Sequence, residues 1–291
     1  MTIEAAEPGF ILRAGPARPE TPVLITVPHA GRDYPLALRS AAACPIEQLA
    51  ALEDRHADRL VELASARGFT TFVAKRARGW IDLNRDEREV DPAMIDPPPA
   101  RHLVRETDKV RGGLGLVPRR LPGGGEIWRR RIDAEDLATR IREEHRPWHD
   151  AIHLALAERR ATFGAALLLE CHSMPPLRRT SGGPPPQLVI GDRYGRSAGA
   201  VLVDRIAAVT RAHGISTAFN APYAGGHALE RHGLPQAGVH AIQIELDRSL
   251  YLASDMRSPG AGLTAAQALV LAIAQALDEE LRAAGLPLAA E

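Results

Sequence analysis

The sequence has few cysteines, and their small number limits the kind of fold. Only Cys44 and Cys171 occur among the 291 residues, far apart along the chain. This excludes a scaffold built on several disulfides and a zinc knuckle built on paired CxxC cysteines, and it is typical of proteins from reducing compartments. We expect both cysteines to be packed thiols.

An excess of charge and long apolar segments are also absent. The 36 basic and 36 acidic residues balance, so the chain as a whole attracts neither nucleic acid nor an anionic membrane. No segment approaches the ~20 apolar residues of a membrane span, and residues 1–15 lack the basic start and apolar stretch of a signal peptide. We therefore expect a cytoplasmic protein with neither nucleic acid nor membrane as a partner.

The composition that is present is that of an ordinary globular protein. Hydrophobic residues make up 45% of the chain and charged residues 25%, which is typical of folded domains. The length suffices for a large core. Because no internal repeat and no clear linker interrupts the chain, we expect residues 1–291 to form a single domain.

Strand and helix patterns alternate along the chain. Short apolar, β-branched segments predict buried strands at residues 22–27, 70–75, 80–83, 166–171, 187–191 and 240–246. Apolar residues at helical spacing, with suitable caps, predict helices at residues 57–67, 133–160, 195–213 and 264–284. This alternation predicts an α/β fold with a mixed, mainly parallel sheet covered by helices on both faces.

Glycine and proline concentrate in four predicted loops, at residues 94–99, 112–125, 175–186 and 221–237. Loops that follow the carboxyl ends of strands are where α/β enzymes place their ligands.

Two predicted strands end in histidine. His29 follows the strand at 22–27, and His172 follows the strand at 166–171. Imidazole is the commonest metal ligand, and two imidazoles from adjacent strand ends can converge on one ion. A single histidine at a strand end is more often a hydrogen-bonded loop residue, so the pair is informative only with further ligands.

A cluster of acidic residues and a histidine supplies candidates for a third ligand. Asp54, His56 and Asp58 lie at the approach to the predicted helix 57–67. A catalytic metal site uses three protein ligands and one open position for water. The alternative is a solvated helix start, in which Asp54 or Asp58 complements the helix dipole.

Glu245 is an acidic residue inside an apolar strand, between Ile244 and Leu246. Burial raises the pKa of a carboxylate and a nearby dication lowers it, so such a residue can act as a general base near neutral pH. The alternative is a structural ion pair with Arg248.

Asn84 and Arg85 directly follow the predicted strand at 80–83. Arginine binds a carboxylate through two parallel hydrogen bonds, and this is how an enzyme anchors an acidic substrate. The alternative is an ion pair of Arg85 with Asp82 or Asp86.

Ordered motifs resemble those of the N-formylglutamate amidohydrolase (deformylase) family, metal enzymes of histidine breakdown that release formate from N-formyl-L-glutamate. The segments that carry the resemblance lie at residues 27–35 (VPHAGRDYP), 53–68, 81–87 (IDLNRDE), 115–118, 146–152, 170–175 (ECHSMP) and 221–252. The family is distantly similar to the zinc carboxypeptidases, which implies a three-layer α/β/α fold and a catalytic domain that spans the chain.

The resemblance assigns roles to the candidate residues. It implies that His29, His172 and Asp54 bind Zn²⁺ or another divalent transition metal, with Asp58 in reserve. It implies that Glu245 is the general base. It further implies that Asn84 and Arg85 bind the carboxylate of a small acidic N-acyl amino acid.

The chain departs from the family pattern at three places. It has Glu170 where Asp is usual, His227 where an aromatic residue is usual, and Trp in the segment Pro147–His149 where Tyr is usual. His227 follows two glycines and is expected to line the substrate pocket. It favours, as an alternative, a related zinc hydrolase of another N-acyl amino acid or a small peptide.

Two alternatives come from other classes of protein. The arginine-rich segment 119–132, with Trp128, is typical of an anion- or RNA-binding surface, although loop ion pairs or the admission of an anionic substrate explain it better at zero net charge. A serine or cysteine hydrolase is the weaker alternative, because the sequence has no G-x-S-x-G motif.

Overall fold

The computed structural model describes residues 9–13, 19–178 and 184–285. Residues 179–183 of the predicted loop 175–186 lie outside this part of the chain. The chain divides into two compact units. The first unit comprises Met1–Ile11, His29–Glu53 and Ala74–Ala151, and the second unit comprises Leu12–Pro28, Asp54–Val73 and Ile152–Glu291.

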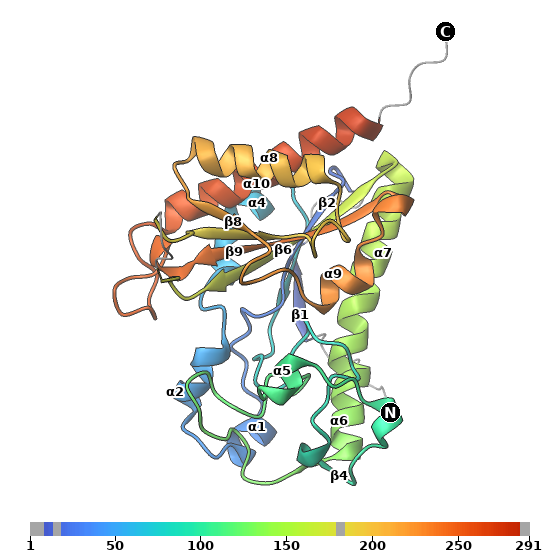
Figure 1. Ribbon diagram of the computed structural model, residues 1–291, viewed down its shortest axis with the longest axis vertical. Helices are drawn as coiled ribbons and strands as arrows, with labels where there is room; N and C mark the ends of the chain where they lie inside the picture. The colour runs from blue at the N-terminus through green and yellow to red at the C-terminus, as the bar shows by residue number, and fades with distance from the viewer. Residues whose placement is uncertain (1–8, 14–18, 179–183, 286–291) are drawn as a thin grey trace, which may run out of the picture. The chain divides into compact units, whose positions relative to one another are not determined.

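A seven-stranded sheet organises the second unit (Figure 1). Its strands, in spatial order, are β1 (Phe10–Arg13), β3 (Thr71–Ala74), β2 (Val23–Val27), β6 (Ala166–Met174), β9 (Val239–Asp247), β7 (Leu188–Gly191) and β8 (Thr217–Phe219). Strand β2 is parallel to β3 and β6, and β6 is parallel to β9. Strand β7 is parallel to β8 but antiparallel to β9. The predicted mixed, mainly parallel sheet is therefore confirmed.

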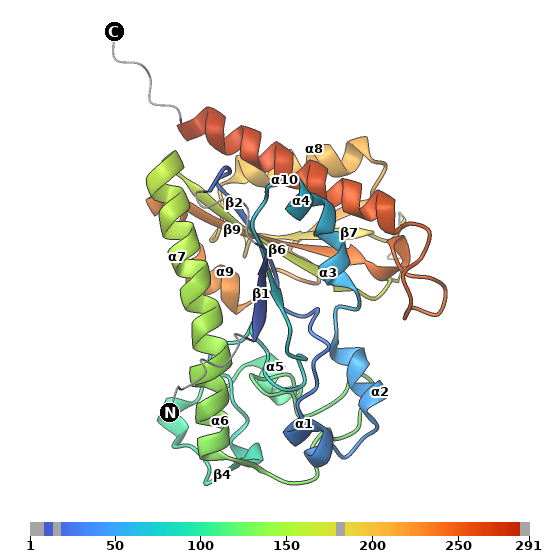
Figure 2. The same cartoon turned by 180° about the vertical axis from the view of Figure 1, so that it is seen from behind.

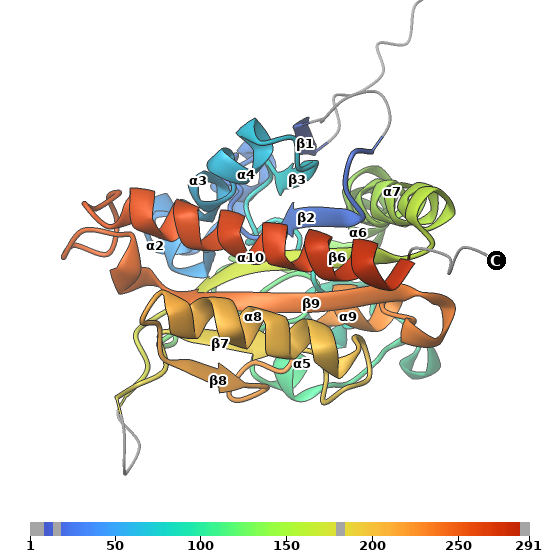
Figure 3. The same ribbon diagram turned by 90° about the horizontal axis from the view of Figure 1, so that it is seen from above.

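Helices cover both faces of this sheet. The helices α8 (Ala200–Ala212) and α10 (Leu263–Gly285) lie side by side over one face (Figure 3). The short helices α3 (Ala57–Leu60) and α4 (Glu62–Ala66) pack beside α10 (Figure 2). Helix α9 (His227–His232) lies on the other face, against β6 and β9. The three-layer α/β/α arrangement is confirmed.

The central strands are buried because both faces of the sheet are covered. All residues of β2, β3, β6 and β7 are buried. Their apolar, β-branched sequences pack without exposing backbone polar groups, since the neighbouring strands satisfy them.

The first unit has short elements and long loops. It contains the helices α1 (Leu36–Ala41), α2 (Ile46–Leu49), α5 (Asp108–Arg111) and α6 (Ala134–Arg140), and a two-stranded parallel sheet of β4 (Ile95–Asp96) and β5 (Ile132–Asp133). Helix α6 continues through a π-helical segment, Ile141–His145, into α7 (Arg146–Phe163). The predicted helix 133–160 is therefore present, but it contains a π-helical turn.

The predicted strand at 80–83 is wrong. This segment is buried and irregular. Its backbone groups bond to a side chain and to a loop carbonyl instead of to a neighbouring strand: the carbonyl of Leu83 accepts from His149, and the N–H of Asp82 donates to the carbonyl of Leu116.

Other differences concern boundaries and weak elements. The predicted helix 57–67 is interrupted at Val61, and the helix predicted at 195–213 begins at Ala200. The sequence patterns also missed the short strands β1 and β8 and the helix α9 inside a predicted loop. No helix among the described residues has the length and apolar character to cross a membrane.

Candidate active site

Two candidate residues lie next to each other on adjacent strands of the sheet in the second unit. His172 on β6 is the direct register partner of Glu245 on β9, close to the carboxyl ends of both strands. Because side chains alternate between the two faces of a sheet, partners in register project from the same face. The structure thus brings the histidine and the predicted base together.

His172 lies between two carboxylates. Its Nδ1 lies 2.8 Å from Oδ2 of Asp54, and its Nε2 lies 3.0 Å from Oε2 of Glu170. All three side chains are buried. Burial alone lowers the pKa of His172, but the charge of Glu170 and the hydrogen bonds to Asp54 and Glu170 outweigh it and hold this pKa well above its usual range.

Arg248 balances part of this negative charge. Its Nη2 donates to Oδ1 of Asp54 at 3.2 Å, and its Nε donates to the hydroxyl of Ser173 at 3.1 Å. Arg248, proposed from the sequence as an alternative partner of Glu245, therefore pairs with Asp54.

The three candidate ligands near residue 54 lie in different surroundings. Asp54 lies directly beside His172. The imidazole of His56 instead lies against the carbonyl of Arg257, with Nε2 3.0 Å from that oxygen. Asp58 lies in the first turn of α3.

Glu245 is half-buried rather than fully buried, which leaves its carboxylate in reach of a ligand. The neighbouring Cys171 is fully buried, and burial raises the pKa of its thiol above the ordinary value. A buried thiol that stays protonated is not a nucleophile. His227 is the first residue of α9 and is half-buried.

In the first unit, His29 is held by a buried carboxylate. Its Nε2–H donates to Oδ1 of Asp82 at 2.7 Å, and Oδ2 of Asp82 accepts from Nε of Arg78 at 2.8 Å. Burial raises the pKa of Asp82, but Arg78, His29 and Arg85 outweigh it and hold the pKa well below its usual range. Asp82 is therefore a permanent anion that orients the imidazole.

Asp82 also connects His29 to Asn84 and Arg85. The backbone N–H of Asn84 donates to Oδ1 of Asp82 at 2.9 Å. Arg85 donates from Nε to the carbonyl of Leu114 at 2.9 Å and from Nη1 to the carbonyl of Asn84 at 2.7 Å, and its Nε lies 3.9 Å from Asp82. Since a guanidinium has five N–H donors, three remain, and they include both donors of Nη2.

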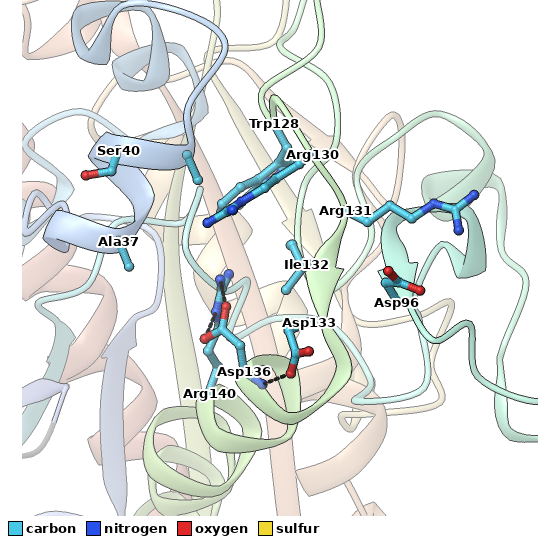
Figure 4. A pocket seen from close by; sticks show the side chains of 11 residues that line it. Ala37, Ser40, Asp96, Trp128, Arg130, Arg131, Ile132, Asp133, Asp136 and Arg140 are labelled. Atoms are coloured by element: carbon cyan, nitrogen blue, oxygen red, sulfur yellow. Dashed lines mark hydrogen bonds and ion pairs between the residues drawn. The ribbon is translucent and has the colours of Figure 1, made fainter.

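The arginine-rich segment forms ion pairs and borders a pocket of the first unit. Arg119 pairs with Asp91 at 3.0 Å, and Arg120 pairs with Glu126 at 3.1 Å. Trp128, Arg130, Arg131 and Arg140 line a cavity of about 400 Å³ (Figure 4). Arg140 is also paired with Asp136 and stacked on Trp80. Loop ion pairs thus account for Arg119 and Arg120.

The sequence patterns did not reveal the partner of His29, nor the two histidines that bond to the backbone beside Asn84. The pairing of His29 with Asp82 joins residues that lie 53 positions apart, and no local pattern reveals it. His145 and His149 lie on one helical face at a spacing of four, which was a usable signal. Their imidazoles bond to the backbone of residues 83 and 85.

The donor set fits a divalent metal of the zinc class. Each unit offers a buried histidine whose Nε2 is engaged by a carboxylate, Asp82 or Glu170. Carboxylate–histidine pairs of this kind orient metal-ligating imidazoles, which then bind the ion through Nδ1. In the second unit, Asp54 adds a carboxylate oxygen at Nδ1 of His172.

A mixed α/β/α sheet with a histidine and acidic side chains at the carboxyl ends of adjacent parallel strands defines an α/β enzyme. Comparison with known proteins specifies which kind. The sequence profile of the N-formylglutamate amidohydrolase family matches residues 21–252. The chain belongs to this family and is an amidohydrolase.

Relatives of known sequence and structure agree. The chain is 30% identical over 241 residues to an N-formylglutamate deformylase of Pseudomonas aeruginosa, a match that covers 81% of this chain and 84% of the relative. It is 29% identical over 237 residues to one of Pseudomonas putida, covering 79% and 82%. The crystal structure of an N-formylglutamate amidohydrolase from Ralstonia eutropha superposes with a TM-score of 0.87 and 29% identity, over 96% of this chain and 100% of that chain.

A more distant solved structure shares the fold alone. It is a gene product of Agrobacterium tumefaciens, with a TM-score of 0.65 and 19% identity over 94% of this chain and 95% of that chain.

Proposed function

We propose that the protein hydrolyses the formyl amide of N-formyl-L-glutamate to formate and glutamate, a step of histidine degradation, and that the reaction requires a divalent metal. Membership of the family supports the substrate, since the Pseudomonas relatives are N-formylglutamate deformylases. The observation that carries the catalytic role is the register of His172 opposite Glu245, with Asp54 at Nδ1 of His172. Both units belong to one catalytic domain, residues 1–291.

The proposed metal ligands are His29, Asp54 and His172. Chain connectivity supports this set: β2 and β6 are adjacent, with Thr26 opposite Glu170, and His29 follows only two residues after β2 ends. Two imidazoles and a carboxylate are the ligand set of many catalytic zinc sites. Zn²⁺ bound to these residues supplies a Lewis acid that polarises the formyl carbonyl and lowers the pKa of a water molecule.

Glu245 is the proposed general base. Its half-buried carboxylate accepts a proton from the attacking water and returns it to the leaving nitrogen of glutamate. The position beside His172 on a rigid central strand supports this role, because a base must stay within hydrogen-bond reach of its water.

Asn84 and Arg85 are the proposed carboxylate-binding residues. The three N–H donors of Arg85 that remain beyond the carbonyls of Asn84 and Leu114 suffice for a two-point contact with a substrate carboxylate. His227, half-buried at the start of α9, is proposed to contact the substrate and to adjust specificity.

The test measures formate release from N-formyl-L-glutamate by the purified protein as isolated, after chelation, and after Zn²⁺ is restored. We expect activity to vanish with the metal and to return with it. Activity that survives complete metal removal refutes the metal mechanism. A panel of N-formyl, N-acetyl and dipeptide derivatives of glutamate identifies the acyl group, and preference for an N-acetyl or peptide substrate favours the related hydrolase.

A further inference from the structure

Two buried histidines of the first unit bond to the segment that carries Asn84 and Arg85. His145 is the last residue of the π-helical segment, and His149 lies in the first turns of α7. A spacing of four residues places both imidazoles on one face of the helix, with ring centroids 4.5 Å apart. Both side chains are fully buried.

Each imidazole bonds to a backbone carbonyl on either side of Asn84. Nε2–H of His149 donates to the carbonyl of Leu83 at 3.0 Å, and Nε2–H of His145 donates to the carbonyl of Arg85 at 2.7 Å. Because a carbonyl oxygen only accepts, both histidines must carry their proton on Nε2.

Among the described residues, no strand pairs with this segment. The carbonyls of Leu83 and Arg85 would otherwise be buried without the ladder partners that a strand provides. The N–H groups of Asp82 and Asn84 bond to the carbonyl of Leu116 and to the carboxylate of Asp82. The two histidine side chains of the helix thus supply hydrogen bonds that hold this irregular backbone segment in place.

We propose that His145 and His149 are positioning residues, which hold the backbone of residues 83–85 so that Arg85 presents its remaining N–H donors to the substrate carboxylate. This inference rests on the proposed function of Arg85. A shift of the segment changes the geometry of a two-point contact, whereas it leaves the proton transfer at Glu245 unchanged. The loss of either histidine therefore acts on substrate binding.

The test uses His149→Phe, which keeps a ring and removes the donor, in the metal-loaded enzyme. We expect the KM for N-formyl-L-glutamate to rise about tenfold, the effect of one lost hydrogen bond of moderate strength, with kcat within about twofold. His153→Phe, on the exposed face of α7, is the matched control and should leave both constants unchanged. A fall in kcat at constant KM overturns the inference.

Two further variants separate positioning from packing. The amide nitrogen of glutamine can occupy the place of Nε2, whereas that of asparagine falls short. His149→Gln should therefore retain a near wild-type KM while His149→Asn does not, and equal behaviour of the two overturns the inference. In an Arg85→Lys background, His149→Phe should add less than twofold, because the two changes remove the same contact.

A measurement without substrate separates this inference from the proposed function. Hydrogen exchange of the backbone amides at residues 82–85 should accelerate in His149→Phe and stay slow in His153→Phe. If the wild-type enzyme releases no formate, the proposed function fails. If hydrogen exchange at residues 82–85 is unchanged in His149→Phe, the positioning role of His149 is refuted, whatever the outcome for formate.

Discussion

His29 in the first unit and His172 in the second unit each contact a buried carboxylate, but the charged side chains around the two histidines differ. Each has its Nε2 next to a buried carboxylate, Asp82 at 2.7 Å or Glu170 at 3.0 Å. Asp82 is compensated by Arg78 and Arg85. His172, in contrast, lies between two carboxylates, Asp54 and Glu170, and Arg248 contacts Asp54.

The difference separates two roles that a carboxylate can have beside a histidine. A carboxylate whose charge arginines compensate, such as Asp82, orients its histidine and holds a fixed charge. Asp54 contacts Nδ1 of His172, the ring nitrogen that would bind the ion, and is therefore the better candidate for a metal ligand. The two environments therefore predict unequal results for similar substitutions.

The largest effect should come from a residue outside both carboxylate–histidine pairs. Glu245→Gln removes the proposed base but keeps the shape of the side chain. We expect kcat for formate release to fall about 10³-fold, within the range for general bases, at unchanged metal content and thermal stability. Near wild-type turnover of a folded, metal-loaded Glu245→Gln protein would show that the base is elsewhere.

Asp54→Asn should have the next largest effect, on metal affinity. Loss of a direct ligand should weaken Zn²⁺ binding by more than about 100-fold, beyond the range for residues that only orient a ligand. Competition with a chromophoric chelator measures this. Asp58→Asn, only four residues along the chain, is the matched control. If Asp58→Asn loses the metal and Asp54→Asn keeps it, the carboxylate ligand is misassigned.

Substitution of the two orienting carboxylates tests the comparison directly. Asp82→Asn and Glu170→Gln should each weaken metal binding by about 10- to 100-fold. Their stabilities should differ: Asp82→Asn removes the buried anion that Arg78, Arg85 and His29 share and should cost roughly 3 kcal/mol, whereas Glu170→Gln leaves His172 next to Asp54 and should cost less. Equal free energies of unfolding, measured by denaturant titration, would contradict the contrast in charge environment.

The fold was predictable where burial follows from the local sequence. The segments around β2, β6 and β9 are apolar and β-branched because they are covered on both faces, and this leaves a pattern that can be read. The segment 80–83 has a similar pattern, yet side chains from a distant helix, His149 among them, satisfy its backbone. No local pattern distinguishes that arrangement from a strand.

The positions of two candidate residues were predictable where a polar residue stands out against an apolar strand pattern. His172 follows one such segment and Glu245 lies inside another, and the sheet register places them side by side. The choice between Asp54 and Asp58 depends on the turn before α3, and the partnership of His29 with Asp82 depends on contacts between distant segments. Both depend on the folded chain, so the sequence left the choice between Asp54 and Asp58 open and did not reveal the pairing of His29 with Asp82.

Another buried histidine, His232, should give the smallest effect. Burial, and then the charges of Arg231, His227 and His153, lower the pKa of His232 to about 3. An unfolded histidine titrates near 6.5, so below that pH the unfolded state binds one more proton than the folded state. Stability is therefore intact above pH 6.5 and declines as the pH falls toward 3, by about 1.4 kcal/mol per pH unit for this one group.

Denaturant titrations of the wild type and of His232→Leu at pH 7.0, 6.0 and 5.0 measure that slope. Many groups titrate in this interval, but they are common to both proteins, so the difference in slope isolates His232. As the pH falls, the free energy of unfolding of His232→Leu should decrease less steeply than that of the wild type. The difference should be about 1.4 kcal/mol per pH unit, the contribution of one bound proton. Parallel slopes would mean that His232 is protonated in the folded state, and then a buried histidine in this protein would not need a carboxylate to hold its charge, as His172 does.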